Sequence, residues 1–121
     1  MKKPRPQSPF QNFLYRFDVY LSLQDKDGRM VDLSKFAEIE QEIMDAFGGL
    51  TRTPIFGNPV YDGFWQSPKT REIAKDKNSI FTVFTPQDQK SIQFFIAKKE
   101  QWRKRLDYEA ILITAHEIMV I

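Results

Sequence analysis

Three side chains of different chemistry alternate along an apolar segment near the N-terminus. Arg16, Asp18 and Tyr20 stand at every second position, and alternate residues of a β-strand point to the same face. His116, the sole histidine, lies in the last apolar segment and joins them if its parity is right. Carboxylate, phenol and imidazole groups on one surface could transfer protons. Asp18, Tyr20 and His116 are therefore candidate catalytic residues.

The same surface could also bind a small anion. Arg16 is the candidate for holding it, and Tyr61 and Trp65 are candidates for lying nearby. However, mixed aromatic and charged groups are also typical of an oligomer interface, and we favour that interpretation. His116 and Glu117 are neighbours, which point to opposite faces of a strand and cannot ligate one metal together. We expect neither a metal nor a cofactor.

A cluster of cations lies near residue 100, in a segment with helical spacing. Cations complement the negative end of a helix dipole, which explains much of this cluster. The alternative is a phosphate-binding stripe for nucleic acid, aided by the basic loop at 69–77 and by an exposed Phe94. Ferredoxin-like RNA binders carry strand aromatics beside glycines; Phe81 or Phe84 could serve here, but the glycines are absent. The nucleic-acid candidates are Lys98, Lys99, Arg103, Lys104 and Arg105.

The first half of the chain predicts a strand and a helix. Odd-numbered residues from 13 to 23 are all apolar, which indicates a strand with one face on the core. Residues 33–47 have apolar side chains close to helical spacing. Asp32 or Ser34 could cap the start of this helix, and Gly48 and Gly49 end it.

The second half is less regular. Prolines and glycines interrupt residues 50–67, which favours a kinked strand at a sheet edge. Residues 69–78 predict a loop or hairpin connection, and residues 79–85 predict a strand. Pro86 suits the first turn of a long helix that runs to Leu106. Residues 109–121 are largely apolar on both alternations, so we expect this last strand to be covered on both sides.

This order predicts an α+β, ferredoxin-like β-α-β-β-α-β sandwich, with a four-stranded antiparallel sheet and two helices on one face. The helices then lie side by side with opposite charges. Residues 32–47 contain five acidic and one basic side chain, a sum of −4, and residues 87–106 contain six basic and two acidic, a sum of +4. Their flanks are therefore expected to be complementary.

Composition restricts the setting. The chain has 121 residues, no cysteine and a net charge of +2. The lack of cysteine excludes disulfides and thiolate catalysis and favours a reducing, cytoplasmic compartment. No apolar run approaches the length that spans a membrane. Residues 1–9 are basic and proline-rich and predict a disordered tail, followed by a single domain at 10–121.

Two short motifs resemble a known group of proteins. Phe47-Gly48-Gly49-Leu50-Thr51, then Gly63-Phe64-Trp65 and the acidic Glu72, are similar to a pattern in small bacterial ferredoxin-like proteins of unknown function. The segment TRTPIFGNPVYD is longer here than in that pattern. The resemblance implies the ferredoxin-like fold, and oligomers like those of PII and CutA-type proteins.

The leading hypothesis is a non-enzymatic interaction or regulatory module that oligomerises through its sheet or its last strand. Its partner would be a second copy or an operon-encoded protein. The alternative is a nucleic-acid-binding module that uses the basic helix end and the 69–77 loop. A third possibility is a small enzyme that uses the open face of the sheet, for which His116 must lie on that face.

Overall fold

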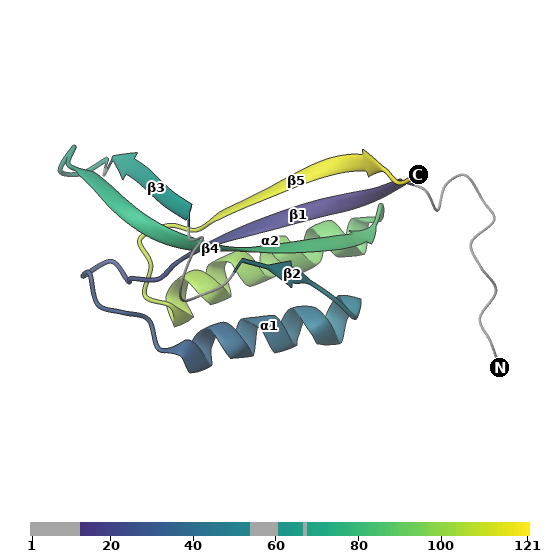
Figure 1. Ribbon diagram of the computed structural model, residues 1–121, viewed down its shortest axis with the longest axis horizontal. Coiled ribbons are helices and arrows are strands. Elements are labelled where there is room, and N and C mark those ends of the chain that lie inside the picture. The colour runs from purple at the N-terminus through teal and green to yellow at the C-terminus, as the bar shows by residue number, and fades with distance from the viewer. Residues whose placement is uncertain (1–12, 54–60, 67) are drawn as a thin grey trace.

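The protein is an antiparallel sheet with two helices packed on one face (Figure 1). The computed structural model describes residues 13–53, 61–66 and 68–121; the tail predicted at 1–9 lies outside them. The α+β class, the antiparallel sheet and the two helices are confirmed. The elements are β1 (Phe13–Ser22), α1 (Leu33–Phe47), β2 (Thr51–Arg52), β3 (Tyr61–Gln66), β4 (Ile73–Pro86), α2 (Gln89–Arg105) and β5 (Leu112–Met119).

The central strand is β1, which pairs with β4 on one side and with β5 on the other. The sheet order is β2-β4-β1-β5, and β3 also pairs with β4. Phe17, Val19 and Leu21 are buried on the helix side of β1, as the alternation in the sequence predicts. The residues between them therefore face away from the helices.

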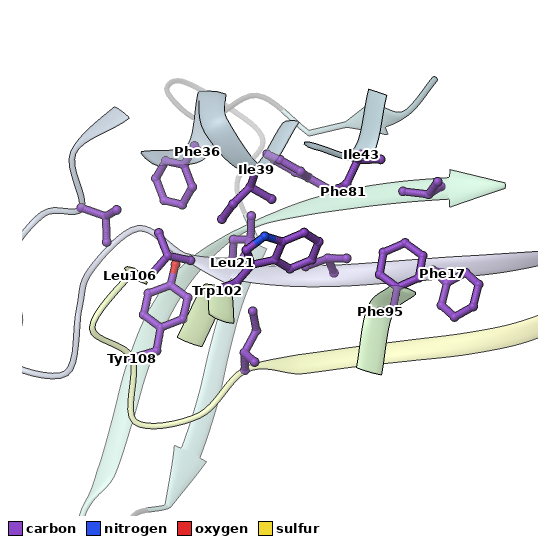
Figure 2. Packing of buried hydrophobic residues seen from close by; sticks show 14 of the residues in the cluster. Phe17, Leu21, Phe36, Ile39, Ile43, Phe81, Phe95, Trp102, Leu106 and Tyr108 are labelled. Atoms are coloured by element: carbon purple, nitrogen blue, oxygen red, sulfur yellow. The ribbon is translucent and has the colours of Figure 1, made fainter. Parts of the chain in front are cut away.

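An aromatic core joins the sheet to both helices. Trp102 of α2 is completely buried, and Figure 2 shows it in the middle of the cluster, between residues of α1 and β1. At one end of the cluster, Phe17 and Phe95 stack with their ring centroids 4.2 Å apart. Large aromatic side chains bury most area per residue, so they account for much of the core of so small a chain.

Local capping signals define the helices. Asp32 caps α1 by accepting a hydrogen bond from the Ser34 backbone N–H, and Gly48 ends it with φ of 81°. The predicted start of the second helix was wrong, because Pro86 belongs to β4 and Asp88 is the N-cap of α2. In the described part of the chain, neither helix is long and apolar enough to cross a membrane.

The single kinked strand predicted at residues 50–67 is two strands in the structure. Both pair with β4, β2 near its middle and β3 along its first half. The loop predicted at residues 69–78 was also wrong from Ile73 onward, because this segment is strand paired with β3. Strands β3 and β4 form a hairpin, so the hairpin connection predicted here is shorter than expected and ends before Ile73.

The last strand is an edge strand, and the described part of this chain does not itself cover it on both sides. Within the described residues, β5 pairs with β1 alone. Ala115 and Glu117 are exposed although they lie on the helix side of the sheet, and Leu112 and Met119 are also exposed. The helices cover this face only as far as the start of β5, where Ile113 packs against the core.

Candidate functional site

The predicted polar residues gather on the sheet face that is turned away from the helices, which we call the open face. Arg16, Asp18 and Tyr20 share it because they alternate with the buried residues of β1. His116 lies directly opposite Arg16 in the register of β1 and β5, so it shares this face. The condition that the sequence set for a site at this face is therefore met.

The register arranges the open face in rows across the sheet. In the first row, Arg16 lies between Phe84 of β4 and His116 of β5; in the second, Asp18 lies between Thr82 and Thr114. In the third, Tyr20 lies between Ile80 and Leu112. Residues directly opposite one another have Cβ atoms about 5 Å apart, so each row is within side-chain reach.

Asp18 is the buried centre of this face. Its side chain is only 6% exposed, because it lies on the central strand with neighbours on both sides. The Thr82 hydroxyl donates a hydrogen bond of 2.6 Å to Oδ1, and Arg16 Nε donates to both carboxylate oxygens at 3.2 and 3.1 Å. A buried carboxylate is tolerated when it is paired and hydrogen-bonded, and both conditions hold here.

Thr114 flanks Asp18 on the other side. Its Oγ1 is buried and has no hydrogen-bond partner among the described residues. A buried hydroxyl without a partner costs about 1–3 kcal/mol. The two threonines were missed in the sequence because only the register between strands places them beside Asp18. Thr82 and Thr114 thus both lie beside Asp18, but only the Thr82 hydroxyl donates a hydrogen bond to it.

Arg16 and its row partners are accessible. The Arg16 side chain is 46% exposed, Phe84 is 48% exposed and His116 is exposed. Asp18 occupies Nε of Arg16, which leaves the two terminal amino groups as a planar fork. Such a fork matches the two oxygens of a carboxylate or phosphate. Tyr20 is half-buried in the third row.

The other two ligand candidates lie on β3. The structure pairs the Tyr61 backbone with Asn78 and the Trp65 backbone with Ala74. Asn78 is in turn opposite Ser22, so β3 joins the sheet beyond the end of the Tyr20 row. The side chains of Tyr61 and Trp65 lie outside what the structure describes. Among the described residues, no three histidine or acidic side chains form a group that could hold a metal.

Most of the predicted nucleic-acid cluster is engaged in ion pairs. Lys98 donates to Glu42 at 2.8 Å, and Arg105 pairs with Glu42 and Glu38. Arg103 pairs with Glu100 on its own helix. Lys99 and Lys104 are exposed on α2. The opposite charges of the two helices therefore serve to join them, as their sequence sums predict.

Of the three aromatics predicted to aid nucleic-acid binding, only Phe84 is exposed. Phe94 was expected to be exposed, but it packs edge to face with Phe47 and Trp102. Phe81 is fully buried on the helix side, whereas Phe84 is exposed on the open face, the side of the sheet away from α2. A basic stripe with an adjacent stacking platform is therefore not formed by these residues.

Glu42 is the centre of the joint between the helices. Trp102 Nε1 donates to it at 3.2 Å, in addition to Lys98 and Arg105. Partial burial raises the pKa of this carboxyl, but the hydrogen bonds from Arg105, Lys98 and Trp102 outweigh burial and hold the pKa below its usual value. The carboxylate form is thus the one that the fold stabilises.

Comparisons with known proteins give one informative likeness. No family model matches the sequence, and no curated protein does. Among solved structures, a phage SAM lyase in complex with S-methyl-5'-thioadenosine is similar in fold, with a TM-score of 0.65 and 7% identity. The likeness covers 99% of this chain and 97% of the lyase chain, so it extends over the whole fold.

This likeness contradicts the leading hypothesis from the sequence. A non-enzymatic interaction or regulatory module was inferred from the apolar pattern of the last strand, on both of its faces. The same fold, from end to end, is that of an enzyme with a bound nucleoside. The non-enzymatic interpretation was therefore wrong, because a small sheet with one uncovered face can carry a reaction without any short motif.

Proposed function

We propose that this protein is a small enzyme that cleaves a carbon–sulfur bond of S-adenosylmethionine at its open face. The observation that carries this proposal is that one face of the sheet, the open face, holds all four of these side chains: Arg16, Asp18, Tyr20 and His116. The likeness of the whole fold to a SAM lyase supports the choice of substrate. The sequence analysis did not indicate this substrate.

Cleavage of the sulfur–carbon bond of S-adenosylmethionine requires few functional groups from the protein. The sulfur of S-adenosylmethionine carries a positive charge, so it leaves as a neutral thioether and needs no general acid. The enzyme must hold the cation, hold the amino-acid end and accept a proton. The Tyr20 ring can attract the sulfonium by its negative face. His116 is an imidazole on the same face and is suited to accept the proton.

The step balances without a co-reactant. The bond between sulfur and the methionyl carbon breaks, and its electron pair goes to sulfur to give S-methyl-5'-thioadenosine. His116 takes a proton from the neighbouring carbon, and the electrons of that C–H bond form a carbon–carbon double bond in the amino-acid fragment. Asp18 is buried and acts by positioning Arg16, which it contacts at Nε.

Incubation of the purified protein with S-adenosylmethionine tests this proposal. We expect S-methyl-5'-thioadenosine by liquid chromatography, with the second product identified by mass spectrometry. His116→Gln and Tyr20→Leu should each lower the rate, because they remove the base and the aromatic ring that attracts the sulfonium. Glu117→Gln is the matched control, since Glu117 adjoins His116 but lies on the helix side. Failure of the wild-type protein both to bind and to cleave the substrate would reject the proposal.

We also propose that the fold is ferredoxin-like, with β2 and β3 together in the place of the second strand. The order β2-β4-β1-β5 supports this. If β2 and β3 count as the second strand, the first and third strands lie in the middle of the sheet, and the last strand pairs with the first. Kinship with the small bacterial proteins that share the Phe-Gly-Gly-x-Thr motif remains a proposal as well. Gly48 supports the motif's structural role, since it ends α1 in the left-handed conformation.

Self-association is a separate proposal about the same enzyme. Strand β5 exposes apolar side chains on its two faces, including Leu112 and Met119, and its outer edge, unpaired among the described residues, is a template for pairing with another chain. We therefore propose that a second copy pairs there, in a cytoplasmic setting that the lack of cysteine favours. Light scattering over a range of concentrations tests this, and a constant monomer mass would reject it.

A further inference from the structure

Arg16 is half-exposed and is held through Nε of its guanidinium. Its contacts with Asp18 are made through Nε, at 3.2 and 3.1 Å, and Asp18 is itself fixed by Thr82 at 2.6 Å. An arginine held in this way loses less freedom when it binds a ligand, because the protein has already restricted it. The terminal amino groups are the donors that remain for an oxyanion.

His116 and Phe84 lie on the strands on either side of Arg16. Each is directly opposite Arg16 in the register, and both are exposed. An imidazole N–H is a second donor for an anion bound by Arg16. The Phe84 ring offers a flat apolar surface on which the rest of a ligand can lie. The row thus combines two donor groups with an aromatic platform.

We propose that Arg16 and His116 form an oxyanion subsite, oriented by Asp18, which takes a carboxylate or phosphate group of the ligand. This inference deepens the proposed function, on which it rests for the rest of the ligand: in S-adenosylmethionine the anionic group is the carboxylate of the amino-acid end. The affinity for small anions rests on the geometry of Arg16 and His116 alone.

The subsite accounts for the polar side chains of the Arg16 row and the Asp18 row. Leu112 and Ile80 in the Tyr20 row are apolar, whereas the Arg16 row and the Asp18 row place charge and hydroxyl groups at matching positions. The charged and titratable groups on the open face of β1 and β5 are Arg16, Asp18, Tyr20 and His116. Glu117, on the opposite face, is not among them.

The sole histidine makes the first experiment simple. The imidazole proton signals of His116 in an NMR spectrum need no assignment, because no other histidine exists in the chain. At fixed pH and ionic strength, sodium acetate and inorganic phosphate are titrated in separate samples of the full chain. We expect a saturable shift of the His116 signals with at least one of these anions. The anion that saturates at the lower concentration is the one that the subsite prefers.

Variants then assign the effect to Arg16. Arg16→Gln should abolish the saturable shift, and Arg16→Lys should weaken it because lysine keeps the charge but lacks the fork. Arg29→Gln is the matched control: it removes the same charge from an exposed arginine in the turn after β1 and should leave the shift unchanged. The subsite is wrong if neither anion shifts His116, or if Arg16→Gln shifts as the wild type does.

A second experiment connects the subsite with the substrate. Binding of S-adenosylmethionine is compared with that of its decarboxylated analogue, which lacks the carboxylate. The wild type should prefer the carboxylate by about tenfold or more, as a charge-assisted paired contact implies, and Arg16→Gln should lose this preference. Equal loss of both ligands on Arg16→Gln would contradict a carboxylate contact.

The two experiments separate the failures. If acetate or phosphate shifts His116 through Arg16 but S-adenosylmethionine neither binds nor reacts, the subsite stands and the proposed function fails. If S-adenosylmethionine is cleaved while Arg16→Gln retains the anion shifts and the carboxylate preference, the proposed function stands and the subsite fails. Circular dichroism of each variant confirms that a loss is not due to unfolding.

Discussion

The Thr82 hydroxyl donates a hydrogen bond of 2.6 Å to the Asp18 carboxylate across β4 and β1. Thr114 lies at the same level on the other side of Asp18, and its buried hydroxyl has no partner in the described part of the chain. The two threonines therefore allow a direct comparison. The Thr82 hydroxyl stabilises a buried carboxylate, whereas the Thr114 hydroxyl lowers the stability of the fold.

Replacement of each threonine by valine should have opposite results. Thr82→Val removes a hydrogen bond to a charged group and should lower the free energy of unfolding by about 1–3 kcal/mol. Thr114→Val removes a hydroxyl without a partner and should leave that free energy unchanged or raise it. Urea unfolding of both variants measures the difference. Equal destabilisation by the two substitutions would contradict the hydrogen-bond assignment.

A double-mutant cycle isolates the contact between Thr82 and Asp18. Asp18→Asn, Thr82→Val and the double variant should give a coupling free energy of about 0.5–3 kcal/mol, because residues in direct contact are not additive. Asp18→Asn combined with Gly49→Ala, a change outside the sheet, should instead be additive. Additivity in the Thr82 cycle would show that the contact contributes nothing to stability.

The end of α1 offers a second matched comparison. Gly48 has φ of 81° and Gly49 does not have a positive φ, while an added Cβ would meet nothing within 4 Å at either position. Gly48→Ala should therefore cost about 1–2 kcal/mol for the left-handed conformation alone, and Gly49→Ala should be close to neutral. Thermal unfolding monitored by circular dichroism measures both. Similar losses would mean that packing, not φ, determines the effect.

Local signals explain which parts of the fold the sequence predicts well. The bounds of α1 follow from its apolar spacing, from Asp32 at its start and from Gly48 at its end, all within one segment. The core face of β1 likewise follows from alternation within ten residues. The first half of β4 could not be found in this way, because its polar residues are strand only through pairing with β3.

The candidate site shows the same division. Alternation within β1 places Arg16, Asp18 and Tyr20 on one face without any knowledge of the rest of the sheet. The meeting of His116 with Arg16 depends on the register of two strands that are about a hundred residues apart in the chain. Thr82 and Thr114 required the register as well. Parity along a strand is local information, whereas register is set by tertiary packing.

Trp102 tests the aromatic core. Its side chain is completely buried, and Nε1 donates to Glu42 at 3.2 Å. Trp102→Ala should lower the free energy of unfolding by about 3–5 kcal/mol, because it leaves a large cavity. Trp102→Phe should cost less, since most of the ring is retained while the hydrogen bond is lost. Urea unfolding of both variants measures this order, and a small loss for the alanine variant would contradict a core role.

The contacts of Glu42 with α2 predict how the free energy of unfolding depends on pH. Hydrogen bonds from Arg105, Lys98 and Trp102 outweigh the effect of burial and lower the pKa of Glu42 in the folded protein from its usual value of 4.5. A carboxyl with a lowered folded pKa stabilises the fold fully above its unfolded pKa. This contribution is lost as the pH falls through the folded pKa. The two helices are therefore held together most strongly near neutral pH.

Glu42→Gln removes this dependence and should be measured across that range. At pH 7 we expect the variant to be less stable than the wild type by about 1–2 kcal/mol, since bonds between charged groups are replaced by neutral ones. The difference should shrink as the pH falls below 4.5, the usual value of this carboxyl, because the unfolded chain takes up the proton first, and it should vanish once the pH passes the lower pKa of Glu42 in the folded protein. Glu109→Gln, at an exposed position, is the control and should differ little from wild type throughout. A difference for Glu42→Gln that stays constant from pH 7 to pH 3 would show that the carboxylate charge does not join the helices.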